Sequence, residues 1–371
     1  MKNKENACPA KKCSIGGQAL IEGIMMRGPK KSAIAVRDPK GNMVVEEWDN
    51  KSKKRLAIFK WAIIRGVFGF IDSMTIGYKA LMRSAEIAID EEEEERLKEE
   101  KKAKKNKKPK KEKNPEEEKK ESSAFLGIVM GVASVLGTVL AVALFMLLPT
   151  YIYAWLENVL PFLPINNPEL APKDITALNS LVKSSFEGVL RIIILVAYMA
   201  LITLMKDIRR TFMYHGAEHK TIFCYENGLE LTVENVRKQR RFHPRCGTSF
   251  LILMLIVSIF ISFFIDPIFI LINGAPAHVA VRSVIKLLLL PLNMGIGYEL
   301  IKLAGKHDNL FTRIISAPGM WLQHLTVLEP DDDMIECAIE AFVRVLPENE
   351  KKPCAEVTEE TAPEAKEETN E

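Results

Sequence analysis

The feature that most constrains this chain is a stretch of 25 residues without a charged side chain, from Ala124 to Leu148. A helix needs about 20 apolar residues to cross the hydrocarbon core of a bilayer, so this stretch is long enough to span one. A buried helix in a soluble core rarely reaches this length without a charge. Its small residues recur on one side, as in helices that pack closely in lipid: Gly127, Gly131, Ser134 and Gly137. The sequence therefore predicts a transmembrane helix here.

Three further apolar stretches predict a bundle of about four transmembrane helices. They are Phe186–Met205, Phe250–Ile265 and Val284–Ile301. We expect Asp266 and Pro267 to end the helix that contains the second of them. The third is interrupted by polar residues and proline, so a re-entrant segment is its alternative: Lys286, Pro291, Asn293 and Glu299. The predicted fold class is mainly α, a polytopic α-helical membrane protein with a small N-terminal β-hairpin region.

The hairpin is predicted from residues 14–49. SAIAVR and MVVEEW read as strands, and the intervening DPKGN supplies turn residues. The segment GGQALIEG, ahead of these strands, does not fit a dinucleotide-binding loop. It lacks the third glycine, a strand before it and a helix after it. A bend or a close approach of the backbone to another segment is therefore expected there.

These patterns divide the chain into five regions. An amphipathic membrane-associated helix is expected at 56–82, because four charged residues interrupt an apolar stretch, and a fifth span is its alternative. The Glu/Lys run that follows cannot bury apolar surface and predicts a solvated linker. The regions are the β-hairpin region 1–55, the helix 56–82, the linker 83–122, the transmembrane bundle 123–328 with a cytoplasmic loop at 206–247, and a cytoplasmic helix with a disordered acidic tail at 329–371.

The distribution of Lys and Arg predicts that both termini are cytoplasmic. Basic residues gather before the first span, after the second and before the third, whereas the loop around residues 272–280 has none. Arg282 and Lys286, at the outer end of the fourth span, disagree with this pattern. The polar N-terminus does not resemble a secretory signal peptide, and six cysteines, most in segments predicted to be cytoplasmic, indicate reduced thiols. A net charge of +3 gives no reason to expect nucleic acid as a partner.

One predicted cytoplasmic loop carries a pattern of metal-binding residues. His215 and His219 are four residues apart, so on a helix they share a face and can bind one metal ion. Glu218 completes the pattern H-x-x-E-H, in which the carboxylate takes a proton from a water that attacks a carbonyl or phosphoryl centre. These residues predict a zinc site at the cytoplasmic membrane face, with Glu218 as the catalytic base.

A third ligand is needed, and the sequence leaves its identity open. His243 and Cys246 form H-P-R-C just before the third span. Cys224 lies five residues beyond His219 and would point away on an unbroken helix, so it ranks below them. Glu226 and Glu299 are further candidates.

Three functions compete. The first is a metal-dependent hydrolase acting on a peptide or on a lipid-linked ester or phosphate in the bilayer. The second is a non-enzymatic scaffold, in which His215, His219, His243 and Cys246 hold a closed structural zinc ion. The third is a transporter that uses Asp266, Lys286 and Glu299, although no internal repeat is visible. The histidines could alternatively be satisfied by headgroups or backbone at the interface without a metal.

Several long motifs resemble a known family. GGQALIEGIMMRGP, YHGAEHKTIFCYENG, LTVENVR, HPRCGTSFL and LEPDDDMIECAIEA together resemble the YqhQ-like bacterial integral membrane proteins. The resemblance covers about residues 13–345 and leaves out the Glu/Lys run, which departs from the family, and the acidic tail. It implies a multi-pass protein of the bacterial cell membrane and a predicted metal-dependent enzyme. It also implies that the family's motif residues are His215, Glu218, His219, His243 and Cys246 here.

Overall fold

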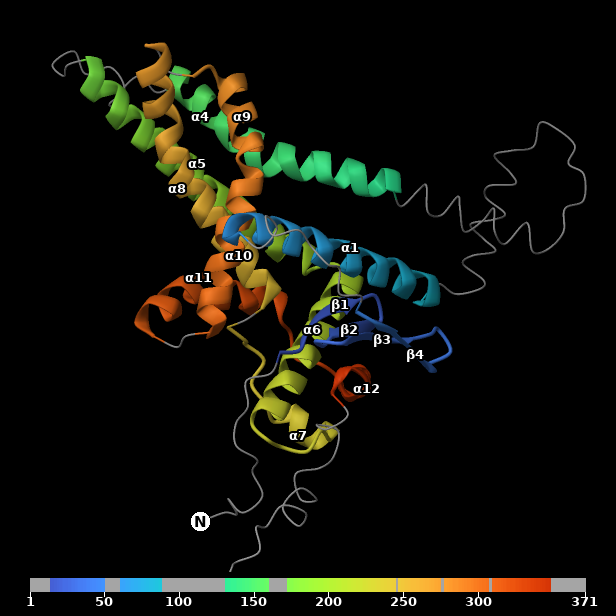
Figure 1. Cartoon of the computed structure of the whole chain (residues 1–371). Coiled ribbons are helices and arrows are strands. Elements are labelled where there is room, and N and C mark those ends of the chain that lie inside the picture. Colours follow the sequence, from blue (N-terminus) through green and yellow to red (C-terminus); the bar gives the residue numbers. More distant parts are fainter. Residues whose placement is uncertain are drawn as a thin grey trace, which may run out of the picture.

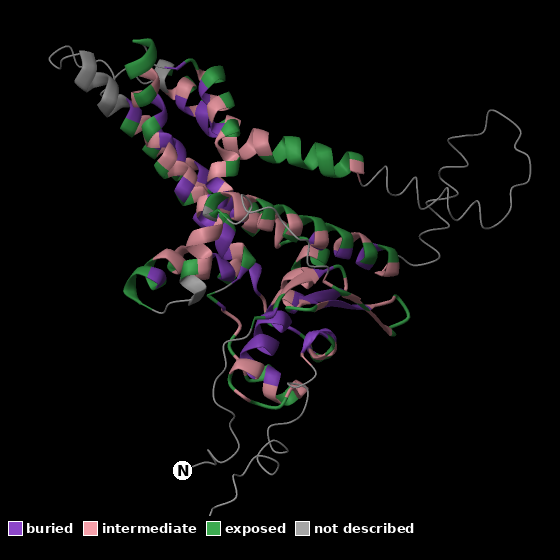
Figure 2. Ribbon diagram, in the orientation of Figure 1, coloured by how far each residue is buried: buried purple, intermediate pink, exposed green. Residues whose placement is uncertain are grey.

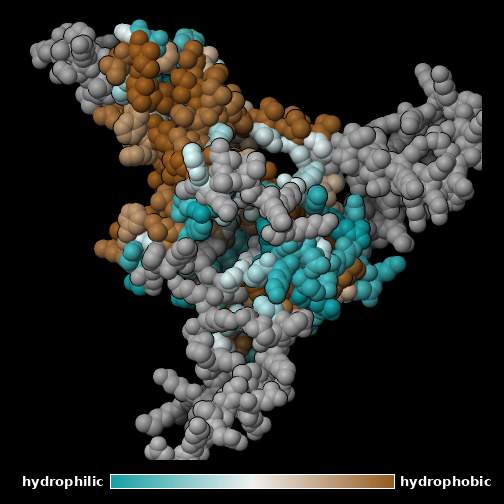
Figure 3. Space-filling model, in the orientation of Figure 1, coloured by the Kyte–Doolittle hydropathy of each residue, from teal (hydrophilic) through white to brown (hydrophobic). Residues whose placement is uncertain are grey.

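The protein consists of an apolar helical bundle with a mixed α/β lobe at one end (Figure 1). The computed structural model describes residues 14–50, 61–88, 131–159, 172–244, 246–274, 277–306 and 309–347. The visible hydrophobic surface gathers on the bundle, and the hydrophilic surface gathers on the lobe (Figure 3). Most of the predicted linker and the acidic tail from residue 348 onward lie outside the described residues.

The lobe is built on a four-stranded antiparallel sheet in the order β1-β2-β3-β4. Its strands are β1 (Gly16–Leu20), β2 (Gly23–Arg27), β3 (Lys31–Arg37) and β4 (Met43–Asp49). The predicted hairpin is confirmed as β3 and β4, and the glycine-rich segment ahead of it adds two more strands that its composition did not predict. Glu22, in the turn between β1 and β2, has a φ of 50°, and its carboxylate accepts two hydrogen bonds of 2.6 Å from Arg210.

Helices cover both faces of this sheet, so β2 and β3 are mostly buried (Figure 2). One face packs on α6 (Lys206–Glu226) and α12 (Asp332–Val345). Tyr214 of α6 and Phe342 of α12 are fully buried in this core. The other face packs on α1 (Ala62–Ala88). Alternate side chains of a strand point to opposite faces, which explains why a continuous apolar run such as Ala33–Val36 suits a sheet covered twice.

Within the described residues, three helices are long and apolar enough to cross a membrane, or four if one bent pair counts as a single span. The first is Gly131–Leu156, which includes the π-helical turn η2 (Ala143–Leu147) and most of α4 (Leu148–Val159). The second is Ser180–Ile202, within α5 (Pro172–Ile202). The third is α8 (Gly247–Asn273). The bent pair is α9 (Val279–Leu288) with α10 (Leu290–Lys306), which meet at 46°. The predicted polytopic α-helical fold is therefore confirmed, and the interruptions in the fourth stretch coincide with a broken helix.

The prediction that Asp266 and Pro267 end the third span is wrong. Helix α8 continues through Pro267 to Asn273 and ends at Gly274, which has a φ of 75°. Proline is tolerated in membrane helices because neighbouring groups can satisfy the freed carbonyl. Asp266 remains inside the bundle because its Oδ2 lies 3.0 Å from Nη1 of Arg282 on α9.

Two shorter elements complete the described chain. Helix α7 (Val233–Arg237) lies in the lobe, and α11 (Leu310–Thr326) packs beside α8 at the junction between bundle and lobe. Gly319 makes this contact possible, since a Cβ there would lie 2.5 Å from Oγ of Ser249. The carboxyl end of α11 therefore sits next to the beginning of α8, which is where the candidate site lies.

Candidate metal centre

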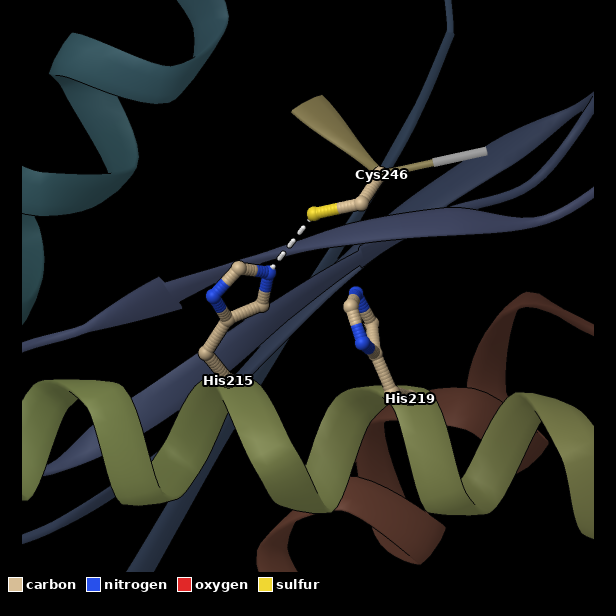
Figure 4. A group of neighbouring side chains, drawn as sticks. All are labelled: His215, His219 and Cys246. Atoms are coloured by element: carbon tan, nitrogen blue, oxygen red, sulfur yellow. Dashed lines mark hydrogen bonds between the residues drawn. The ribbon is translucent and has the colours of Figure 1, made fainter. Parts of the chain in front are cut away.

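Helix α6 carries the two histidines of the H-x-x-E-H pattern out of the bundle. Three residues separate its beginning from the end of α5 at Ile202, and it passes against the sheet of the lobe. His215 and His219 lie one turn apart on the same face of α6, and their ring centroids are 4.5 Å apart. Both rings point toward Cys246, which caps the beginning of α8 (Figure 4).

The three side chains form a compact group. Nε2 of His215 lies 3.1 Å from Sγ of Cys246, and one ligand atom from each of the three residues falls within 4.8 Å of the others. His219 and Cys246 are buried, and His215 is half-buried. Within the described residues, no other group of histidine, cysteine and acidic side chains gathers in this way.

Backbone carbonyls fix the orientation of both rings. Nδ1 of His215 lies 2.9 Å from the carbonyl oxygen of Thr326, and Nδ1 of His219 lies 2.5 Å from that of Arg241. Since a carbonyl can only accept, each Nδ1 carries the proton and each Nε2 keeps a lone pair when the ring is neutral. This is the tautomer in which a histidine binds metal through Nε2.

The segment that supplies the Thr326 carbonyl is held close to α6. The backbone N–H of Leu328 donates to the carbonyl oxygen of Phe212 at 2.9 Å. Gly216 permits this approach, because a Cβ there would overlap the carbonyl oxygen of Leu328. A glycine directly after His215 is therefore required by the path of a segment more than 100 residues later.

The electrostatics of the group favour a thiolate. Burial by itself raises the pKa of the Cys246 thiol, but His215 and His219 outweigh burial and lower it well below its usual range. Burial likewise lowers the pKa of His215, and the Cys246 thiolate outweighs it and raises that pKa to about 9. Cys246 also accepts from the N–H of Thr248 at 3.4 Å, at a helix N-terminus that favours negative charge. The thiolate is the form of cysteine that binds metal.

Glu218 lies beside the group and is held by strand β1. Its Oε1 accepts a hydrogen bond of 2.9 Å from the backbone N–H of Gly17. Burial raises the pKa of the carboxyl group, although His215 and His219 act against burial. A Cβ at Gly17 would lie 2.9 Å from Cδ of Glu218 and 2.8 Å from the carbonyl oxygen of Met25. The close backbone approach expected in the glycine-rich segment is thus found, although it occurs within a strand.

His243 lies next to the three-residue group and not within it. Its Nε2 lies 3.5 Å from Oε2 of Glu226, and its ring centroid is 5.7 Å from that of His219. Gln323 of α11 holds the His243 backbone in both directions, accepting from its N–H at 2.9 Å and donating to its carbonyl at 2.7 Å. This clamp fixes the backbone at His243, three residues ahead of Cys246.

Two other candidates lie elsewhere. Cys224 is a buried thiol whose pKa rises to about 11 through burial, and its Sγ lies 3.4 Å from the carbonyl oxygen of Glu230. Glu299 pairs with the guanidinium of Arg65 on α1, with both of its carboxylate oxygens at 2.7 Å. That ion pair explains how a carboxylate is accommodated in the fourth apolar stretch.

Sequence reasoning missed three groups that shape the site. The Thr326 carbonyl, the Arg241 carbonyl and the Gln323 side chain orient His215, His219 and the H-P-R-C segment. Backbone carbonyls leave no sequence signal. Gln323 gives a faint one, because it is a polar residue in the apolar run MWLQHL and is fully buried.

Comparisons with known proteins place the site within a matched region. A family model described as "Protein of unknown function (DUF1385)" matches residues 61–348. The chain is 31% identical over 338 residues to "Uncharacterized protein YqhQ" of Bacillus subtilis (strain 168), covering 90% of this chain and 92% of that protein. No solved structure matches the chain. His215, Glu218, His219, His243 and Cys246 all fall within the range of the family model.

Proposed function

This chain belongs to the DUF1385 family of YqhQ-like proteins, and we propose that it is a zinc-dependent hydrolase of the membrane surface. The observation that carries the proposal is the convergence of His215, His219 and Cys246 beside the carboxylate of Glu218. Two imidazoles and a thiolate are ligands that zinc prefers. The expected metal is therefore zinc.

The number of converging ligands supports a catalytic site over a structural one. Structural zinc ions are held by four protein ligands, whereas catalytic zinc ions have three and an open position. The ring of His243, the fourth ligand in the structural alternative, lies against Glu226 and Phe223. The hydrogen bonds to Thr326 and Arg241 aim both Nε2 atoms without help from the metal.

The chemistry that follows uses Glu218 as the base. When bound, a zinc ion acts as a Lewis acid and makes water nucleophilic at neutral pH. Glu218 takes the proton of the attacking water and returns it to the leaving group. The Gly17 N–H holds the carboxylate at Oε1 and leaves Oε2 for the proton. The group lies at the junction of lobe and bundle, where α6 leaves the bundle and α8 enters it. We therefore propose a peptide or a lipid-linked ester or phosphate as substrate.

X-ray absorption at the zinc edge of the purified, zinc-loaded protein tests this proposal. We expect two nitrogen ligands, one sulfur ligand and one oxygen ligand, because three protein ligands leave one position for solvent. Three nitrogen ligands and one sulfur ligand, with no oxygen, would contradict the hydrolase. That result would support the structural zinc scaffold, with His243 as the fourth ligand.

We further propose that both termini and the site face the cytoplasm of a bacterial cell. The bias of Lys and Arg supports this orientation. Arg282 and Lys286, which disagreed with it, are buried against carboxylates and so do not act as free loop charges. A green fluorescent protein fused after residue 371 should fluoresce, and alkaline phosphatase fused after residue 274 should be active outside the cytoplasm. Active phosphatase at residue 371 would reverse the orientation.

A further inference from the structure

A second cluster of charged side chains lies buried in the bundle, far from the metal centre. It contains two residues of α5, one of α8 and two of α9. Their exposed fractions are 5% or less: Glu187 1%, Arg191 3%, Asp266 4%, Arg282 0% and Lys286 5%. Charged groups buried in a membrane bundle are costly unless they are paired, and they commonly mark functional sites.

The members of this cluster pair with one another. Oε2 of Glu187 lies 2.5 Å from Nζ of Lys286 and 3.3 Å from Nη2 of Arg191. Nη1 of Arg282 lies 3.0 Å from Asp266 and 3.6 Å from Glu187. Neutral neighbours add support, since Arg282 donates to Ser184 at 2.9 Å and Lys286 to Thr150 at 3.4 Å.

The pairing leaves the cluster short of one negative charge. Arg191, Arg282 and Lys286 are three cations, whereas Glu187 and Asp266 are two anions, so the net charge is +1 when all are ionised. A net charge buried without its counter-charge is strongly disfavoured. Hydrogen bonds are missing as well, because Nε of Arg191 and Nε of Arg282 have no acceptor. Oδ1 of Asp266 and Oε1 of Glu187 have no donor.

The depth of the cluster suggests where its counter-charge comes from. Asp266 lies 19 positions after Gly247, which is about 28 Å along α8 at 1.5 Å per residue. The hydrocarbon core is about 30 Å thick, so with Cys246 taken at one boundary of the core the cluster lies near the other, and the last seven residues of α8 extend into the headgroup region. Phospholipid phosphates lie at that level. Arginine forks are suited to phosphate because they donate two parallel hydrogen bonds.

We propose that this cluster binds a ligand that contains both a phosphate group and hydroxyl groups. The phosphate group carries one negative charge. The charge neutralises the cluster, the phosphate oxygens accept from Arg191 and Arg282, and the hydroxyls donate to Asp266 and Glu187. A phosphatidylglycerol headgroup and a free dihydrogen phosphate ion share this chemistry. The site is independent of the zinc centre, so neither proposal depends on the other.

Native mass spectrometry of the detergent-purified full chain tests the lipid source. With added phosphatidylglycerol, wild type should retain about one lipid, and Arg191→Met should retain roughly tenfold less, because one charge-assisted hydrogen bond is lost. In Arg191→Met the remaining two cations and two carboxylates balance, so its melting temperature should not fall. The matched control is Lys183→Met, which removes a partly exposed cation of α5 and should retain the lipid.

Inorganic phosphate tests the other source. If the lipid-free wild type and Lys183→Met gain several degrees in melting temperature with phosphate and Arg191→Met does not, the occupant is the free ion. Equal lipid retention and an equal phosphate response in all three proteins would overturn the site. The absence of both effects in wild type would overturn it too.

Discussion

The His219→Ala protein is expected to purify with almost no zinc, against about one zinc ion per chain in wild type. Removing this ring takes away one of the three ligand atoms that converge among the described residues. Loss of an outer-sphere partner alone typically reduces metal affinity by about 10- to 100-fold, and loss of a direct ligand reduces it further. The measurement is inductively coupled plasma mass spectrometry on protein purified in detergent and dialysed against a weak chelator.

A matched control is His324→Ala, because His324 is an exposed histidine of α11 and should leave the zinc content unchanged. His243→Ala separates the two candidates of the H-P-R-C pair. We expect it to keep zinc, since its ring faces Glu226, whereas Cys246→Ser should lose it. Equal zinc in wild type and His219→Ala would remove the basis of the metal centre.

Glu218→Gln is expected to keep zinc and to lose about 10²- to 10⁴-fold in hydrolytic rate, the usual contribution of a general base. The amide has nearly the shape of the carboxylate, and its oxygen can still accept from the Gly17 N–H. It cannot take a proton from water. Because the substrate is defined only by class, the first measurement is an untargeted comparison of peptides and lipids in membranes from cells that make wild type or the variant. The accumulating species then serves as substrate for the purified protein.

Glu234→Gln is the matched control, since Glu234 is an exposed carboxylate of α7 paired with Lys238. It should show the wild-type membrane composition and rate. A Glu218→Gln protein with full activity and normal zinc would contradict the catalytic base. A protein that loses zinc as well would show that Glu218 acts through the stability of the site.

Much of the fold could be predicted because its signals are local. Transfer of an apolar helix into lipid depends on the residues of that helix alone, so Phe186–Met205 and Phe250–Ile265 predicted spans close to those found. The strands SAIAVR and MVVEEW were also predicted, from their strand-like residues and the turn residues between them. Strands β1 and β2 were missed because GGQAL contains two glycines, which disfavour strands, and its pairing partner supplies what the segment lacks.

The candidate site likewise has one part that a local pattern predicts and another that depends on distant segments. The spacing of His215 and His219 places both on one face of any helix, which is a property of the 3.6-residue period. The sequence could not choose between His243 and Cys246, because they are three positions apart and both precede the same predicted span. In the structure, Gln323 holds the His243 backbone from a helix 80 residues further along the chain, and the His243 ring lies against Phe223 and Glu226, so that Cys246 is the one that joins the two histidines.

The sequence by itself thus determined the long apolar helices, the hairpin of β3 and β4 and the helical face that carries His215, Glu218 and His219. The tertiary structure alone decided the course of α8 beyond Asp266, the burial of Arg282 and the convergence of Cys246 with the histidines. The physical reason is the range of the forces involved. Hydropathy and helical period are set by neighbouring residues, whereas the pairing of a buried charge or ligand depends on which distant segment the fold brings against it.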